Sequence, residues 1–317
     1  NTNALMEIHP SERPVALQLF GNEPELMGEV AKSIEERPFD ILDVNMGCPV
    51  PKVVNNREGS ALMKNPKLAH DILAAMVRAV KIPVTVKFRA GWDEEHLNAV
   101  EIAKVVEAAG VSCIAVHGRT RVQFYEGKAN WSIIGDVKKA VGIPVFGNGD
   151  IVSVESGLRM ISETNVDGLM VGRGADGNPW IFRELAAALT GKEIPKDPSL
   201  EERLSLAREH LQMLKDFKGE YISVKEMRRH ISAYLSTTSS RRVSMNPTEC
   251  SPHVQSIASS SDRMMPTHVS QRNHTPSVSQ QKSAILGGRR KRDMSLTSSS
   301  LIVESSQRSS FAKNDLN

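Results

Sequence analysis

Short apolar runs and longer amphipathic stretches alternate along the first 190 residues of the chain. The apolar runs are rich in Val and Ile and end in polar residues or glycine, which is typical of buried strands. The stretches between them are helical in spacing and long enough to cross between parallel strands. The expected strands are 15–19, 41–45, 84–88, 113–117, 144–147 and 168–171, with helices near 24–36, 66–80, 94–109, 130–141, 153–163 and 178–189. This alternation predicts an α/β fold.

Six strands are two fewer than a closed (β/α)8 barrel contains, and an open sheet edge leaves backbone groups unpaired. The chain also begins with a short polar stretch that has no Met. We therefore expect a TIM (β/α)8-type barrel that lacks its first strands. Residues 1–190 would form this partial barrel.

A purely helical pattern follows, and we assign residues 191–235 to a small helical domain. Its apolar positions form two faces, Leu204, Leu206, Ala207, Leu211, Leu214 and Phe217 on one and Val224, Met227, Ile231 and Tyr234 on the other. Its basic positions are Lys215, Lys218, Lys225, Arg228, Arg229 and His230. These charges are typical either of a solvated helix surface or of a surface for RNA phosphates.

Residues 236–317 are rich in Ser, Thr, Arg, Gln and Pro and contain a single aromatic residue, Phe311. A segment of this composition buries too little apolar area to offset its ordering entropy, so we expect a disordered tail. The run 289–292, Arg-Arg-Lys-Arg, is interpreted as a solvated charge run, with a targeting or nucleic-acid motif as the alternative.

The overall composition excludes several classes of protein. A formal charge of +3 on 317 residues is too small for a histone-like nucleic-acid binder. Three cysteines, Cys48, Cys113 and Cys250, form no CxxC pair, so we expect neither a disulfide framework nor a metal site. No apolar run approaches the length of a membrane span, and the first residues show no signal-peptide pattern. We expect a cytoplasmic protein without a membrane contact.

Cys48 lies where the second expected strand ends, in the sequence Asn45-Met46-Gly47-Cys48-Pro49. Gly47 permits a sharp backbone turn and Pro49 restricts the residue before it, so the thiol is presented rather than packed. A thiol with an ordinary pKa near ~8.5 is mostly protonated at neutral pH and can serve as an acid. No His neighbours it as a base would, which favours a proton donor over a nucleophile.

Polar side chains also mark the first and third expected strands. Lys87 and Arg89 alternate on one strand, and cations at the end of an apolar strand are costly unless an anionic group meets them. Lys87 is suited to the N1/O2 edge of an isoalloxazine ring, where negative charge accumulates on reduction. Gln18 ends its strand with an amide that can donate and accept at the same ring edge.

The last three strand ends carry a histidine and two glycine-rich turns. His117 precedes Gly118, a position where a ligand contact is more common than a structural role. The turns are Asn148-Gly149-Asp150 and Gly172-Arg173-Gly174. Barrels often bind phosphate after strands seven and eight, which these turns would follow if two front strands are missing. No GxGxxG motif is present, so FMN fits better than a tightly bound dinucleotide.

Residues 15 to about 235 closely resemble the tRNA-dihydrouridine synthases, particularly their bacterial B-type branch. The motifs that carry the resemblance are Asn45-Met46-Gly47-Cys48-Pro49, Lys87-Phe88-Arg89, His117-Gly118-Arg119-Thr120, Gly147-Asn148-Gly149-Asp150 and Gly172-Arg173-Gly174. The family's first strand and its Pro-Met-Ala loop have no counterpart in this chain. Its helical domain continues where this chain becomes Ser-rich, after residue 235.

The resemblance implies an FMN-containing barrel with a helical domain that binds tRNA. In the implied reaction NADPH reduces FMN, flavin N5 delivers hydride to uracil C6, and Cys48 protonates C5. The implied FMN ligands are Gln18, Lys87, His117, Asn148, Gly149, Asp150, Gly172 and Arg173. Asn45 is expected to face the uracil. The target base must leave its stack, which suits a basic mouth formed by Arg119, Arg121 and Lys128.

Two alternatives remain open from the sequence. The first is another FMN barrel oxidoreductase that acts on a small molecule, such as a relative of the dihydroorotate or enoate reductases. The second is a non-catalytic, RNA-binding remnant whose incomplete barrel does not turn over. A visible spectrum separates the second from either enzyme, and mass analysis of tRNA separates the two enzymes.

Overall fold

The computed structural model describes residues 6, 8, 12–235, 297–298 and 302–304 of the chain. Strands and helices alternate as the sequence predicts, which confirms the α/β class. The parallel strands are β1 (Ala16–Leu19), β2 (Ile41–Met46), β3 (Val84–Arg89), β4 (Cys113–His117), β5 (Val145–Asn148) and β6 (Gly168–Met170). The helices between them are α1 (Pro24–Glu35), α2 (Pro51–Val54), α3 (Pro66–Ala79), α4 (Ala99–Ala108), α5 (Trp131–Ala140) and α6 (Val154–Thr164), and α7 (Ile181–Leu189) follows β6. The described residues also include the 3-10 helices η3 (Gly59–Lys64) and η4 (Arg173–Ala175).

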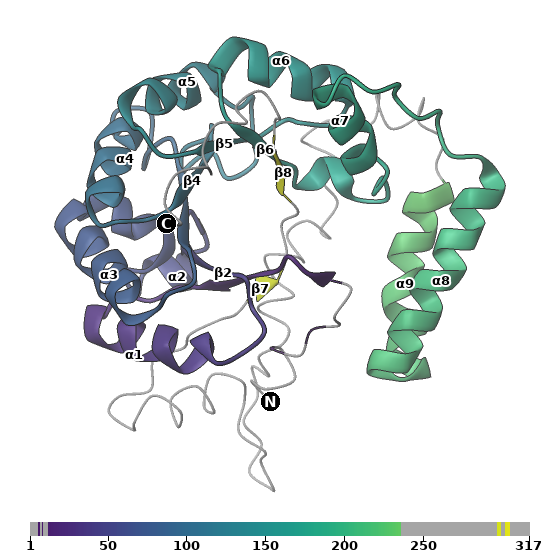
Figure 1. Ribbon diagram of the computed structural model, residues 1–317, viewed down its shortest axis with the longest axis horizontal. Coiled ribbons are helices and arrows are strands. Elements are labelled where there is room, and N and C mark those ends of the chain that lie inside the picture. The colour runs from purple at the N-terminus through teal and green to yellow at the C-terminus, as the bar shows by residue number, and fades with distance from the viewer. Residues whose placement is uncertain (1–5, 7, 9–11, 236–296, 299–301, 305–317) are drawn as a thin grey trace, which may run out of the picture.

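The strands β1 to β6 pair in parallel in sequence order, from β1 with β2 to β5 with β6, as barrel topology requires. The helices α1 and α3–α7 lie around the outside of the strands, and the arc is open on the side between β6 and β1 (Figure 1). The expected barrel-type arrangement of parallel strands and outer helices is therefore confirmed.

Two short segments of the predicted tail pair with the open edges of the sheet. The strand β7 (Thr297–Ser298) runs antiparallel to β1, with Leu17 opposite Ser298. The strand β8 (Ile302–Glu304) runs antiparallel to β6, with Leu169 opposite Val303. Both short strands fall within residues 236–317, whose expected disorder stays a prediction. The rest of the predicted tail, residues 236–296, 299–301 and 305–317, lies outside the described residues.

The strand side chains divide into an outer apolar layer and an inner polar one. Val44, Val86 and Ile114 are fully buried and pack in the main core with the helices. Side chains that alternate with them face the inside of the barrel, because successive residues of a strand point to opposite sides. Strand register places these inner residues in rows, which are Gln18, Asp43 and Thr85 in the first, Asn45, Lys87 and Ala115 in the second, and Arg89, His117 and Asn148 in the third.

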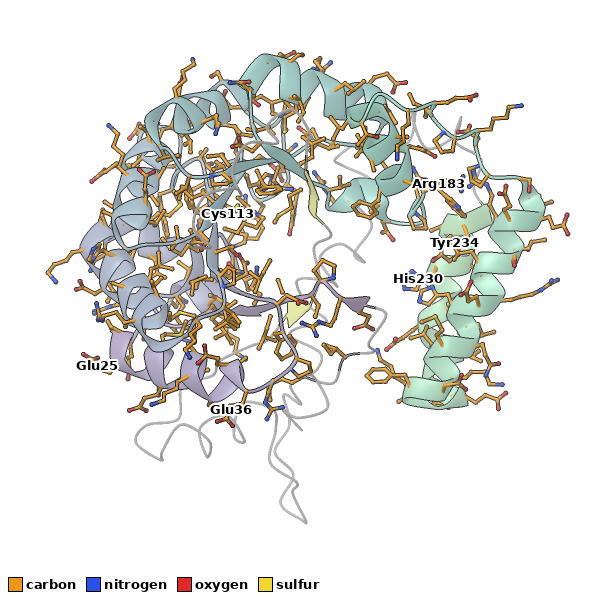
Figure 2. The ribbon with its side chains drawn as sticks, viewed as in Figure 1. Glu25, Glu36, Cys113, Arg183, His230 and Tyr234 are labelled. Atoms are coloured by element: carbon orange, nitrogen blue, oxygen red, sulfur yellow. The ribbon has the colours of Figure 1, made fainter. Side chains whose placement is uncertain are left out.

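The inner layer becomes apolar on the far side of the barrel. Ala115, Phe146 and Met170 form a separate small buried cluster, with Cys113 packed against it. Cys113 therefore lies inside the arc of strands (Figure 2). Cys48 instead follows the carboxyl end of β2. The packing of the Cys113 side chain in this apolar cluster is typical of a buried structural cysteine.

The helices α8 (Leu200–Lys218) and α9 (Glu220–Leu235) form an antiparallel hairpin beside the barrel (Figure 1). Ser199 begins α8 with a reciprocal capping box to Glu202. The hairpin packs on Trp180, which caps α7 and meets Tyr234 edge-on at 6.0 Å. In Figure 2 Tyr234 and His230 lie on the side of the hairpin nearer the barrel.

The predicted apolar faces of this hairpin are only partly correct. Ala207, Met227 and Tyr234 are buried in the cluster around Trp180, and Leu206, Leu211 and Leu214 pack against it. The predicted positions Leu204, Phe217, Val224 and Ile231 are instead exposed. Two helices bury only one stripe of each against the other, so a wider apolar face stays in contact with solvent.

The predicted division at residues 190 and 235 stays a prediction, although 190 falls directly after α7. Among the described residues, no helix is both long enough and apolar enough to cross a membrane.

Candidate functional site at the carboxyl ends of the strands

The Cys48 loop leaves β2 in a tight turn held by three sets of hydrogen bonds. The Asn45 side-chain oxygen accepts from the backbone N–H groups of Gly47 (3.0 Å) and Cys48 (2.8 Å). The Cys48 carbonyl accepts from the backbone N–H (3.1 Å) and the hydroxyl (2.8 Å) of Ser60. Gly59 makes this approach possible, because it has a φ of +57° and an added Cβ would lie 2.9 Å from the Cys48 oxygen. The thiol is half-buried at the end of the strand, as predicted.

Arg89 supplies the third set and joins this loop to the loop after β4. It is 3% exposed, and its guanidinium donates to the carbonyls of Gly47 (2.7 Å), Thr120 (2.9 Å) and Phe124 (2.8 Å). Burial lowers the pKa of Arg89 to about 10, with the nearby Tyr125 and Cys48 opposing the shift. Arg89 therefore holds the loops after β2 and β4 together through these three carbonyls.

Lys87 is half-buried on the inner face of β3. Burial, with the neighbouring Arg89 second, lowers the pKa of Lys87 to about 8, while Asp43 and Cys48 act in the opposite direction. Among the described residues, no salt bridge is formed by Lys87. A cation in this position is suited to an anionic ligand edge.

Asp43 is a buried carboxylate that the sequence analysis did not single out. Its two oxygens accept from the Gln18 amide at 2.6 Å and from the Thr85 hydroxyl at 2.7 Å. Burial raises the pKa of Asp43, against the effect of these hydrogen bonds and of Lys87. Gln18 in turn accepts from the Asn45 amide at 2.8 Å, so the predicted FMN ligand and the predicted uracil ligand are bonded to each other.

His117 is buried in a ring of cations. Burial, followed by Lys87, Arg89, Arg119 and Arg173, lowers the pKa of His117 well below its usual value. The Arg119 guanidinium lies 3.5 Å from His117 Nε2 and can only donate, so Nε2 accepts and the proton resides on Nδ1. A neutral imidazole at neutral pH suits a ligand contact better than an acid role.

Arg119 is not a residue of a basic mouth, contrary to expectation. It is 2% exposed and donates to the carbonyls of Glu126 (3.0 Å) and Gly127 (2.6 Å). Its guanidinium also pairs with Asp150 at 2.8 Å, and Asp150 accepts from the Ala129 N–H at 2.7 Å. Arg119 therefore shapes the loop after β4, because its donors are committed to that loop and to Asp150.

The turn after β5 is also internally bonded. The Asn148 amide donates to the Met170 carbonyl at 2.7 Å, which ties β5 to β6. Gly149 has a φ of +120°, and an added Cβ would lie 2.7 Å from that of Ala129. Trp131 donates from its indole to the Gly149 carbonyl at 3.1 Å. The loops after β4 and β5 therefore hold each other in place.

The turn after β6 is the most open of the set. An added Cβ at Gly172 would meet no atom within 4 Å, whereas one at Gly174 would collide with the Ile151 carbonyl. The glycine at 174 is therefore required by packing and the one at 172 leaves room for a ligand. Arg173 is 34% exposed at its side chain and lies over the Tyr125 ring at 5.0 Å.

The structure thus brings Cys48, Lys87, Gln18 and His117 together at one end of the barrel, with Arg173 at its rim. This donor set fits a flavin mononucleotide, because it offers a buried cation and amide for the ring and an open glycine with an arginine for the phosphate. No group of three or more His, Cys, Asp or Glu suited to a metal is found in the described part of the chain. The cofactor roles of the individual residues stay predictions.

The basic positions of the hairpin are interleaved with acids. Lys218 pairs with Glu226 at 2.9 Å and Lys215 lies 3.8 Å from Glu220. Near the barrel mouth, Trp92 is flanked by Lys64 at 4.4 Å and Arg121 at 4.8 Å from its ring. Trp92, Lys64 and Arg121 thus combine an aromatic ring face with cations, as single-stranded nucleic-acid sites often do.

Known proteins resemble this chain over most of its length. The family model described as Dihydrouridine synthase (Dus) matches residues 1–286. The tRNA-dihydrouridine synthase B of Pseudomonas putida is 44% identical over 237 residues, which are 74% of this chain and 70% of that protein. The Pseudomonas aeruginosa protein of the same name is 46% identical over 232 residues, 73% of this chain and 70% of that protein. A probable tRNA-dihydrouridine synthase of Rhodobacter capsulatus is 46% identical over 221 residues, 70% and 68% of the two chains.

Proposed function

Because the chain belongs to the dihydrouridine synthase family, we propose that it reduces the C5=C6 bond of uridine in tRNA, with FMN as cofactor and NADPH as reductant. The observation that carries this proposal is the Cys48 loop, whose thiol is held beside Lys87 at the mouth of the barrel by hydrogen bonds to its backbone. A flavin oxidoreductase of a small molecule remains the rival that the experiment below excludes.

Bound FMN supplies the hydride for this reaction. The side chains that would hold it are Lys87 and Gln18 at the ring and Gly172 and Arg173 at the phosphate. His117, being neutral, would contribute a hydrogen bond to the cofactor without adding charge. Asn148, Gly149 and Asp150 would act chiefly through the backbone of their turn, because the Asn148 amide and the Asp150 carboxylate already have protein partners.

Cys48 would give its thiol proton to C5 of the uracil. The thiol must be protonated when substrate binds, which is the main form of an ordinary thiol at neutral pH. Lys87 and Arg89 act in the opposite direction and would stabilise the thiolate that the proton transfer leaves. The loop hydrogen bonds from Asn45 and Ser60 would fix the sulfur so that it stays close to the target carbon.

The test is a comparison of Cys48→Ala with Cys113→Ala on purified, FMN-loaded protein. We expect Cys48→Ala to keep its flavin spectrum and to lose at least 100-fold in dihydrouridine formation, measured by mass analysis of tRNA, because general acid catalysis contributes about 10²–10⁴-fold. Cys113→Ala, inside the barrel, should retain activity. Flavin reduction by NADPH without any dihydrouridine formation would instead favour the small-molecule oxidoreductase.

A further inference from the structure

A continuous chain of side-chain hydrogen bonds runs from the first inner row of the barrel to the Cys48 loop. It begins at Asp43, passes through the Gln18 amide (2.6 Å) and the Asn45 amide (2.8 Å), and ends at the backbone N–H groups of Gly47 and Cys48. Strand register explains the first link, because Gln18 on β1 lies directly opposite Asp43 on β2. Asn45 follows two residues later on the same face of β2.

We propose that Asp43 is a positioning residue for Cys48, which it orients through Gln18 and Asn45. Its meaning for catalysis rests on the proposed function, but the positioning itself is a property of the chain alone. The argument depends on the direction of each hydrogen bond, because an amide side chain can be turned either way whereas a carboxylate and a backbone N–H cannot.

The direction of every link is set by the two ends. The N–H groups of Gly47 and Cys48 can only donate, so Asn45 must present its oxygen to them. Its NH₂ then faces Gln18, which must present its oxygen. The NH₂ of Gln18 consequently faces Asp43, whose carboxylate oxygen accepts from it. Thr85 donates to the other carboxylate oxygen at 2.7 Å, so both oxygens are occupied by donors.

A neutral amide in place of Asp43 would remove the constraint at that end of the chain and leave only the loop N–H groups to set its direction. In Asp43→Asn the new side chain can donate or accept, so Gln18 loses the partner that fixes its orientation. An inverted Gln18 would present NH₂ to the Asn45 NH₂, and Asn45 would then turn its oxygen away from the loop. The Cys48 loop would keep its bonds to Ser60 and Arg89 but lose those to Asn45 in a fraction of molecules.

The first experiment measures alkylation of Cys48 by iodoacetamide in flavin-free protein, read by mass from the Cys48 peptide. We expect Asp43→Asn to raise this rate at least fivefold, which corresponds to an ordinary hydrogen bond. The Cys113 rate in the same sample should not change. The control Asp167→Asn removes a carboxylate that accepts from the Val145 N–H at the opposite end of the barrel, and its Cys48 rate should equal that of the unaltered protein.

A Cys48 rate within twofold of the unaltered protein would overturn the proposal. An equal rise at Cys48 and Cys113 would overturn it too, because that result indicates general loosening rather than a local relay. Thr85→Val removes a donor to Asp43 but keeps the link to Gln18, so its Cys48 rate should stay unchanged.

The second experiment is a rescue that does not depend on the first. Asn45→Asp alone places carboxylates on both sides of Gln18, so one of them must face its oxygen whichever way the amide turns. The double variant D43N/N45D permits a complete chain in the reverse direction. We expect the double variant to be more stable to urea than Asn45→Asp, and more stable than D43A/N45D, which relieves the charge but supplies no donor.

Equal or lower stability of the double variant, including failure to fold, would refute the directional chain. The proposed function fails separately. If the Cys48 alkylation and the stability rescue give the expected results while the FMN-loaded protein reduces no tRNA, the positioning role of Asp43 is supported and the proposed reaction is refuted.

Discussion

Gly59 offers a direct test of how the Cys48 loop is held. Its φ is +57°, and a Cβ there would lie 2.9 Å from the Cys48 carbonyl oxygen and 3.0 Å from the Cys48 Cβ. Gly191 is a matched control, because its φ is +67° but a Cβ would meet no atom within 4 Å. Alanine at either position carries the same cost of a left-handed backbone, about 1–2 kcal/mol. Only Gly59→Ala adds the cost of overpacking.

We expect Gly59→Ala to lose about 1–3 kcal/mol more unfolding free energy than Gly191→Ala, which is the usual range for an added methyl in a packed site. Part of this loss arises because a displaced Cys48 carbonyl gives up its bonds to Ser60. Urea unfolding followed by circular dichroism measures the difference. Turnover should fall in Gly59→Ala and stay unchanged in Gly191→Ala. Equal losses within about 0.5 kcal/mol, with equal turnover, would refute the reasoning.

Three further results are expected. Trp180→Ala should destabilise the docking of the α8–α9 hairpin by about 3–5 kcal/mol, seen as faster hydrogen exchange in both helices, whereas Phe217→Ala, at a position 59% exposed, should change little. Because burial lowers the pKa of Lys87 to about 8, the free protein loses this cation as the pH rises. The Kd for FMN should therefore increase about tenfold between pH 7 and 9, and it should show no such dependence in Lys87→Met. Arg89→Lys replaces a guanidinium that donates to three carbonyls by a single ammonium. It should lower the free energy of unfolding by about 2–4 kcal/mol, whereas the exposed Arg159→Lys should lower it by about 0.5 kcal/mol or less.

The sequence predicted the parallel strands to within two residues, because alternation and β-branched content are local signals. It was less accurate where a side chain caps a turn. The helix expected from residue 94 begins at Ala99, since Asp93 accepts from the N–H groups of Glu95 and His96 and closes a turn there. The short elements α2 and η3 were not predicted, because they are too brief to show a period.

The candidate site was predicted in its location but not in its internal bonding. Cys48 and Lys87 were identified because strand ends of a barrel carry its chemistry. The burial of Arg119 depends on carbonyls in a loop whose shape no local pattern encodes. Asp43 did carry a signal, since it is an acidic residue inside an apolar strand and two positions before Asn45. A charge on the inner face of a strand needs a partner, and that expectation would have singled it out.

Below the strand ends that carry His117 and Asn148, the inner surface of the barrel has two unlike halves, with polar side chains on β1–β3 and the apolar cluster of Ala115, Phe146 and Met170 on β4–β6. A planar molecule with one polar and one apolar edge would enter this interior in a single orientation. The reverse orientation would place its apolar edge against Lys87 and Asp43. The polarity of the barrel interior would thus select the orientation of the ligand before any individual hydrogen bond to it forms. The barrel wall itself would favour rings with one polar and one apolar edge, and the residues at the strand ends would add the specific contacts to the ligand.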